Sequence, residues 1–151
     1  MPEVYEKIDF QDNNTQLWNF SKYNPTIVSI ALGTNDFSNG DGKRPRLPFD
    51  SSIFVDTYVK FVKLVKQKYP AAKILLLNTP MIGGERKQIF ENCLEAVKTL
   101  IDHAYPANKP VSLFFFKPMR AGGCTGHPSI ADHAILADEL APFLRKLLSE
   151  G

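Results

Sequence analysis

Two polar clusters in the sequence carry side chains that could do chemistry. The first, Gly33-Thr34-Asn35-Asp36, follows the apolar run of residues 27–32. The second, residues 122–128, contains His127 and comes after the third apolar run of the chain. An amide such as that of Asn35 can donate a hydrogen bond to an oxyanion, and a histidine can shuttle a proton. Together they supply two of the parts that acyl transfer requires.

Alternating strand and helix patterns predict how these clusters are positioned. Unbroken apolar runs at 27–32, 74–77 and 111–116 predict strands buried on both faces, and helical spacing predicts helices over about 50–68, 85–104 and from 129 or 130 onward. Such alternation predicts an α/β fold, with a parallel sheet between helix layers in a three-layer α/β/α arrangement. Because parallel strands point the same way, both polar clusters are expected at one edge of the sheet.

The same periodicity predicts which side chains face the core. Trp18, within the irregular lead-in of residues 1–26, is interpreted as a further core anchor rather than a stacking surface for a ligand. Three strands make a thin sheet for an α/β domain, and nothing before Ile27 could supply more. The predicted core positions of the three helices are Phe54, Tyr58, Phe61, Val62 and Val65; Ile89, Cys93, Val97, Leu100 and Ile101; and Ile135, Leu136, Leu140, Phe143, Leu144 and Leu147.

Length and composition favour one ordinary globular domain. We interpret residues 1–151 as a single domain with a sizeable core. The net charge of +2 is too small to favour nucleic acid or an anionic membrane surface as a partner. No apolar stretch approaches the ~20 residues of a membrane-spanning helix, and the N-terminus lacks a signal-peptide pattern. Cys93 and Cys124 are interpreted as two structural thiols, with one disulfide as the alternative.

Other polar residues receive simpler interpretations. The six-residue spacing from His127 to His133 fits no zinc-ligand pattern, so we expect no metal ion and no other cofactor. Asp132 and Asp138 are interpreted as surface carboxylates of the last helix. A nucleotide site is disfavoured because no glycine-rich phosphate loop follows a strand. The basic side chains of the loop after the first strand are expected to be solvated: Lys43, Arg44 and Arg46.

Two segments, IALGTNDF and GCTGHPSIADH, resemble the SGNH (GDSL-type) hydrolases, and most closely the carbohydrate esterase family 2 acetyl esterases. The superfamily block Gly-x-Asn-Asp is matched by residues 33–36. Its last block, Asp-x-x-His-Pro, is matched by residues 124–128 except at the aspartate. The similarity extends from about Leu17 to the C-terminus. It implies the flavodoxin-like SGNH hydrolase fold, incomplete at its N-terminal side, and an ester hydrolase that removes acetyl groups from carbohydrate, as acetylxylan esterases do.

The resemblance also implies roles for individual residues. Asn35, with Gly33, would form part of the oxyanion hole through its side-chain amide. His127 would be the general base that activates a serine, and later the acid that protonates the leaving alcohol. Asp36 would be a structural residue that holds the loop after the strand.

The match departs from the superfamily pattern beside the histidine. Cys124 stands where the triad aspartate would be, and the family 2 esterases are similar in this respect. In them a backbone carbonyl orients the imidazole, and Thr125 or Cys124 would supply that carbonyl here. A Ser–His dyad keeps the essential proton shuttle. Gly126 stands where family members often carry an aromatic residue, which puts sugar stacking at this position in question.

The nucleophile block is a larger departure. No Gly-Asp-Ser or Gly-x-Ser-x-Gly element occurs in the chain, and the block with the glycine donor of the oxyanion hole is also missing. Ser38 lies near the site but on the wrong loop. The simplest interpretation is the C-terminal portion of a longer esterase, with the serine outside this chain and the chain alone inactive. The serines are Ser21, Ser29, Ser38, Ser51, Ser52, Ser112, Ser129 and Ser149.

A second class of function remains open. A catalytically inactive module that binds carbohydrate, or another partner, could retain this fold without the serine. For the esterase, the expected partner is an acetylated oligosaccharide or polysaccharide, and the resemblance implies a secreted or periplasmic intact protein. A sheet that lacks its first strands would also expose an apolar edge, which predicts self-association.

Overall fold

The computed structural model describes residues 2–9, 15–38 and 47–149. The basic side chains Lys43, Arg44 and Arg46 lie outside the described residues. Within the described residues, the order of the elements follows the predicted alternation of strands and helices.

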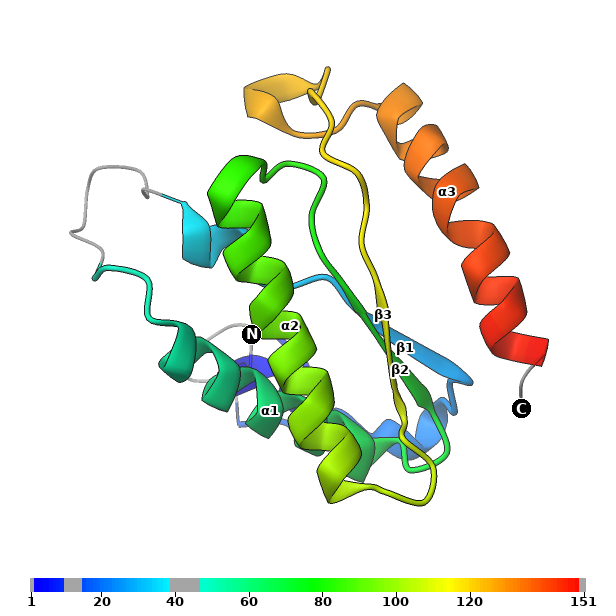
Figure 1. Ribbon diagram of the computed structural model, residues 1–151. Coiled ribbons are helices and arrows are strands. Elements are labelled where there is room, and N and C mark those ends of the chain that lie inside the picture. Colours follow the sequence, from blue (N-terminus) through cyan, green and yellow to red (C-terminus); the bar gives the residue numbers. More distant parts are fainter. Residues whose placement is uncertain (1, 10–14, 39–46, 150–151) are drawn as a thin grey trace.

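Three parallel strands form the centre of the fold (Figure 1). They are β1 (Ile27–Ile30), β2 (Lys73–Leu77) and β3 (Val111–Phe114), in the spatial order β1-β2-β3. The helices α1 (Ser51–Lys68) and α2 (Gly84–Ala104) cover one face, and α3 (Ile130–Ser149) covers the other. The predicted three-layer α/β/α fold with a parallel sheet is therefore confirmed.

Short helical turns complete the chain. Four 3-10 helices are present among the described residues: η1 (Pro2–Val4), η2 (Phe20–Lys22), η3 (Thr34–Phe37) and η4 (Cys124–Gly126). The predicted lead-in is irregular, as expected, apart from η1, η2 and one bridge between Lys7 and Leu17. Phe20 packs against Tyr5 and Tyr69, which attaches the lead-in to α1.

The side chains of the central strand point alternately to two cores. Ile74 and Leu76 pack with α1 and α2, whereas Leu75 and Leu77 pack against α3. All four are almost fully buried, because β2 has a strand on each side and helices on both faces. This is the burial that an uninterrupted apolar run predicts.

The first strand corrects the prediction. β1 ends at Ile30 rather than near residue 32, and Ser29 is exposed although both faces were predicted to be buried. β1 is an edge strand of the described sheet, and α3 packs mainly over β2 and β3. Ser29, on the α3 side, therefore has no helix above it. The third strand is also shorter than predicted and ends at Phe114.

Three predicted core side chains are on the surface. Trp18 is 44% exposed, Leu100 45% and Ile135 58%, so these predictions were wrong. On α2, Phe90 and Leu94 are almost fully buried, which places Leu100 at the margin of the buried stripe, toward solvent. Helical spacing gives the width of an apolar stripe but not its rotation toward the sheet.

Both cysteines are free, Cys93 in the core and Cys124 on the surface, which agrees with the interpretation as two thiols. None of the helices in the described residues is long and apolar enough to cross a membrane.

Candidate functional site

Both polar clusters follow strands at the same edge of the sheet. Three residues separate the end of β1 from η3, and η4 lies between β3 and α3 (Figure 1). In Figure 1 these turns and the N-terminus of α2 all lie in the upper half of the view. The parallel direction of the strands produces this arrangement, since each strand delivers its following loop to the same side.

A pocket of about 800 Å³ joins the two clusters. Asn35 and His127 both belong to its lining, although one follows the first strand and the other follows the third. No serine of the described residues lines it. The rest of the wall is largely apolar and comes from the start of α1, the segment before it and the loop after β2: Leu47, Pro48, Phe49, Ile53, Phe54, Phe61 and Met81.

Gly33 allows the η3 turn to pack tightly on the core. Its φ of +122° lies in the region that favours glycine. A Cβ atom at this position would lie 2.6 Å from Cε2 of Phe90 and 3.2 Å from Cζ of Phe54. The turn that presents Asn35 is thus seated directly on two buried aromatic rings, and Arg86 of α2 donates to the Phe37 carbonyl at 3.1 Å.

The loop of His127 is closed by backbone hydrogen bonds. The Gly123 amide donates to the His127 carbonyl at 2.9 Å, and the His127 amide donates to the Cys124 carbonyl at 3.1 Å. A Cβ atom on Gly123 would lie 2.6 Å from that His127 oxygen. A glycine at this position therefore permits the tight turn that presents the imidazole.

The imidazole of His127 contacts a side chain of its own loop. The Thr125 hydroxyl oxygen lies 3.1 Å from Nδ1 of His127, and the same hydroxyl donates to the Cys124 carbonyl at 2.8 Å. The resemblance implied a backbone carbonyl of Thr125 or Cys124 at the ring. The hydrogen bond at Nδ1 is with the threonine side chain, the Cys124 carbonyl accepts from that hydroxyl, and the role of a backbone carbonyl stays a prediction.

Asp132 does more than the surface role predicted for it. Its Oδ2 accepts hydrogen bonds from the Ser129 amide and hydroxyl, at 2.7 and 2.8 Å, and from the Gly122 amide at 2.8 Å. The Ser129 hydroxyl in turn accepts from the Asp132 amide at 3.2 Å, which completes a reciprocal cap of α3. The backbone donors Gly122 and Ser129 lower the pKa of this carboxyl. Asp132 therefore ties both ends of the His127 loop together.

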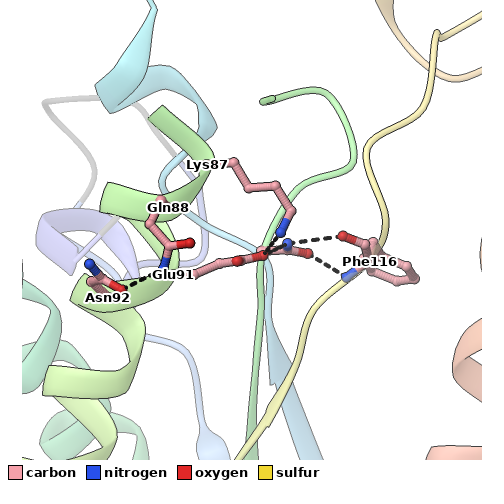
Figure 2. Close-up of polar contacts among 6 residues, drawn as sticks. Lys87, Gln88, Glu91, Asn92 and Phe116 are labelled. Carbon is pink, nitrogen blue, oxygen red and sulfur yellow. Dashed lines mark hydrogen bonds and ion pairs between the residues drawn. The ribbon is translucent and has the colours of Figure 1, made fainter. Parts of the chain in front are cut away.

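A buried polar cluster lies beyond the ends of β2 and β3. Asn78 accepts from the Phe116 amide at 2.7 Å and donates to the Phe116 carbonyl at 3.1 Å and to Glu91 at 2.7 Å. Lys87 pairs with Glu91 at 2.6 Å from one turn earlier on α2 (Figure 2). Sequence reasoning missed this cluster, although an asparagine directly after a buried strand was a usable signal. It holds the segment that leads toward His127 beside β2.

Tyr58 is a second residue that sequence reasoning assigned only to the core. It lines the pocket, and its hydroxyl lies 3.5 Å from the Leu32 carbonyl. Burial strongly raises the pKa of this phenol, so Tyr58 stays protonated near neutral pH. It offers the pocket a neutral hydroxyl.

The remaining predicted residues lie as follows. Asp36 is exposed on η3 and also lines the pocket, and its structural role stays a prediction. The oxyanion roles of Asn35 and Gly33 and the proton-shuttle role of His127 also stay predictions. Among residues 2–9, 15–38 and 47–149, no group of three or more His, Cys, Asp or Glu side chains could hold a metal ion.

Comparison with curated proteins finds carbohydrate-active esterases. The chain is 25% identical over 150 residues to an acetylxylan esterase/glucomannan deacetylase of Cellvibrio japonicus, covering 98% of this chain and 38% of that protein. It is 31% identical over 136 residues to the cellulase/esterase CelE of Acetivibrio thermocellus, covering 87% of this chain and 15% of that protein. The chain thus spans less than two fifths of these relatives. No family model matches it.

Comparison with solved structures finds the same class of enzyme. A family 2 carbohydrate esterase of Cellvibrio japonicus aligns with a TM-score of 0.81 and 25% identity, over 98% of this chain and 41% of that one. A family 2 carbohydrate esterase from Corynascus thermopiles (Myceliophthora fergusii), solved with a carbohydrate-binding domain, aligns with a TM-score of 0.82 and 27% identity. This alignment covers 99% of this chain and 45% of that one. A family 2 carbohydrate esterase from Clostridium thermocellum, in complex with cellohexaose, aligns with a TM-score of 0.70 and 30% identity. This alignment covers 88% of this chain and 39% of that one.

These matches extend over most of the chain, 87–99% of it, and are to the family that the resemblance indicated. The resemblance is therefore confirmed: in sequence and in its α/β fold, this chain is a relative of the family 2 carbohydrate esterases of the SGNH type.

Proposed function

We propose that this chain supplies the histidine and the oxyanion amide of an esterase that removes acetyl groups from carbohydrate. The observation that carries the proposal is the shared pocket, whose lining includes both Asn35 and His127. The relatives are carbohydrate esterases, which supports ester hydrolysis as the reaction class. The nucleophilic serine of the Ser–His dyad would come from residues outside this chain, since no described serine lines the pocket.

The proposed reaction has two half-reactions. In the first, His127 accepts the proton of the serine hydroxyl while the serine oxygen attacks the acetyl carbonyl. The resulting oxyanion accepts a hydrogen bond from the Asn35 amide. Collapse of this intermediate breaks the bond to the sugar oxygen, which takes the proton from His127. Water then attacks the acetyl-serine by the same route, and acetate leaves.

The substrate is proposed to be an acetylated oligosaccharide or polysaccharide. A solved relative binds cellohexaose, and the apolar wall of the pocket, with the 65% exposed Ile53, offers a surface to the faces of sugar rings. Because polymeric carbohydrate does not cross membranes, we propose that the intact protein works outside the cytoplasm, secreted or in the periplasm.

Hydrolysis of an aryl acetate tests the proposal. We expect no hydrolysis by residues 1–151 alone, and hydrolysis by a version extended at its N-terminus to include a Gly-Asp-Ser block. In the extended protein, His127→Ala should lower kcat at least 10³-fold, and Asn35→Ala about 10²-fold, because they remove the base and one oxyanion donor. His133→Ala, on the surface of α3, is the matched control and should keep full activity. An active His127→Ala variant would rule out the proposed dyad.

A carbohydrate-binding module without catalysis is the second candidate. The cellohexaose bound to a solved relative and the exposed apolar lining of the pocket favour it. Calorimetric titration of the chain with cellohexaose separates the two functions. Sugar binding together with an inactive extended protein would favour the module, whereas hydrolysis by the extended protein would favour the esterase.

A further inference from the structure

The loop of His127 contains a threonine in an unusual backbone conformation. Thr125 has φ +54° and ψ +28°, in the left-handed region that β-branched residues rarely adopt. Such a conformation is strained, and residues that hold it gather at functional sites. The next residue is Gly126, and a glycine would also fit at position 125 without strain. What the threonine adds to the loop is its side chain.

The contacts of that side chain define the direction of its hydroxyl hydrogen. Oγ1 of Thr125 donates its one hydrogen to the Cys124 carbonyl at 2.8 Å. A lone pair of the same oxygen then faces Nδ1 of His127 at 3.1 Å. A hydrogen bond across this distance requires the hydrogen to be on Nδ1. The neutral ring then carries its remaining lone pair on Nε2.

We propose that Thr125 is a positioning residue, which holds the neutral imidazole of His127 in the Nδ1–H tautomer through its side-chain hydroxyl. Its catalytic meaning rests on the proposed function, since a general base must have Nε2 free to accept the proton of the nucleophile. The hydrogen bonds run from Nδ1–H to the Thr125 oxygen, and from that hydroxyl to the Cys124 carbonyl. The hydroxyl thus performs the orienting task for which Cys124 offers no carboxylate.

Backbone hydrogen bonds of the same loop hold the acceptor of the threonine hydroxyl in place. The Cys124 carbonyl also accepts from the His127 amide, and the Gly123 amide holds the His127 carbonyl. The acceptor of the threonine hydroxyl is therefore fixed within the same closed turn that fixes the histidine backbone. The left-handed conformation of Thr125 is what lets the two-residue spacing bring Oγ1 to the ring.

Nitrogen NMR of the chain itself tests the tautomer without any activity. Long-range ¹H–¹⁵N spectra of histidine-labelled protein, recorded well above the titration range of imidazole, distinguish protonated from unprotonated ring nitrogens. The chain has three histidines, and His127→Gln identifies the signals of His127. We expect Nδ1 to carry the hydrogen in His127. A wild-type ring with its hydrogen on Nε2 would overturn the proposal, and this result needs no variant.

Two substitutions at position 125 test the role of the hydroxyl. Thr125→Val keeps the β-branched shape and the backbone strain but removes the hydroxyl, so the ratio of Nδ1–H to Nε2–H should fall about tenfold. Thr125→Ser keeps the hydroxyl and should restore the ratio, while His103 and His133 stay unchanged in both variants. An Nδ1–H tautomer that persists in Thr125→Val, with the fold intact in backbone spectra, would show that another group orients the ring.

Failure of this inference is distinguishable from failure of the proposed function. An Nε2–H tautomer in a chain whose extended version hydrolyses aryl acetate rejects the role of Thr125 alone. The Nδ1–H tautomer in a chain whose extended version is inactive rejects the esterase and leaves the orientation of His127 by Thr125 in place.

Discussion

The absence of a Cβ atom at two glycines determines how the turns present Asn35 and His127. Gly33 and Gly123 are required because a Cβ atom at either position would meet another part of the protein at 2.6 Å. At Gly33 the obstacle is an aromatic ring of the core, and at Gly123 it is the backbone carbonyl of His127. Asn35 and His127 are thus presented by turns whose shape depends on the absence of a side chain beside them.

Replacing Gly33 by alanine should destabilise the protein by about 2–4 kcal/mol. The new methyl group would overlap the Phe90 ring, and φ +122° is strained for alanine. Urea unfolding followed by circular dichroism measures the change. Gly84→Ala is the matched control, because Gly84 also has a positive φ but open space around it. Equal losses in the two variants would show that backbone strain, and not the ring, sets the cost.

At the scale of the elements, two hydrogen-bonded groups of side chains hold the loops that follow the carboxyl ends of the strands. The cap of α3 through Asp132 and Ser129 ties the His127 loop to the helix. The cluster of Asn78 and Glu91 attaches the segment after β3 to the end of β2 and to α2. Neither group contacts the histidine ring, yet both determine the path of the backbone that carries it.

Acidification should loosen the start of α3. Because the pKa of Asp132 is lowered in the folded protein, its stabilising contribution is fully present above its ordinary value of 3.8 and is lost as the pH falls through the lower, folded value. Hydrogen exchange of the Gly122 and Ser129 amides, corrected for the intrinsic pH dependence, should therefore lose protection below about pH 4.

The variant Asp132→Asn should show weak protection of these two amides at every pH, because the neutral amide cannot replace the carboxylate as an acceptor of three hydrogen bonds. Asp138→Asn, further along the same helix, is the matched control and should behave like the wild type. Unchanged protection in Asp132→Asn would show that the other backbone hydrogen bonds of the loop, and not Asp132, keep the loop ordered.

The variant Asn78→Ala should lose about 2–4 kcal/mol of stability. It leaves the Phe116 amide without its acceptor and Glu91 without its buried donor. Asn92→Ala, which breaks only the exposed bond to Gln88, should cost less than about 0.5 kcal/mol (Figure 2). Chemical denaturation measures both. If Asn78→Ala lost no more than Asn92→Ala, water would have to replace the asparagine in the cluster.

For the whole molecule, the sheet of the described residues has two outer strands. β1 and β3 each pair only with β2, so neither strand has a pairing partner on its outer side within these residues, and β1 is the one with an exposed side chain, Ser29. Such an edge is a template for pairing with another strand. The expected self-association through this edge stays a prediction.

Sedimentation equilibrium over a range of concentrations tests this prediction, and we expect a rising mass average at high concentration. Ser29→Lys places a charge on the exposed position of the edge strand and should shift the association to at least tenfold higher concentration. Thr99→Lys, exposed on α2, adds the same charge away from the edge and should not. Equal effects of the two variants would point to net charge instead of strand pairing.

The sequence by itself determined the class of fold, the three strands and three helices, and the two clusters of site residues. Local signals carry this information: an uninterrupted apolar run at β2, the 3.6-residue spacing in α1, and polar residues directly after strands. They also allowed the resemblance to family 2 carbohydrate esterases, which the comparisons then confirmed.

Only the tertiary structure decided what depends on contacts between distant segments. The exposure of Leu100 and Ile135 follows from how far each helix is rotated toward the sheet, and Ser29 is exposed because β1 lies at an edge. The partners of Asn78, on α2 and after β3, have no local signature. The Thr125 hydroxyl meets His127 because of one left-handed residue, and no residue pattern specifies such a conformation for a threonine.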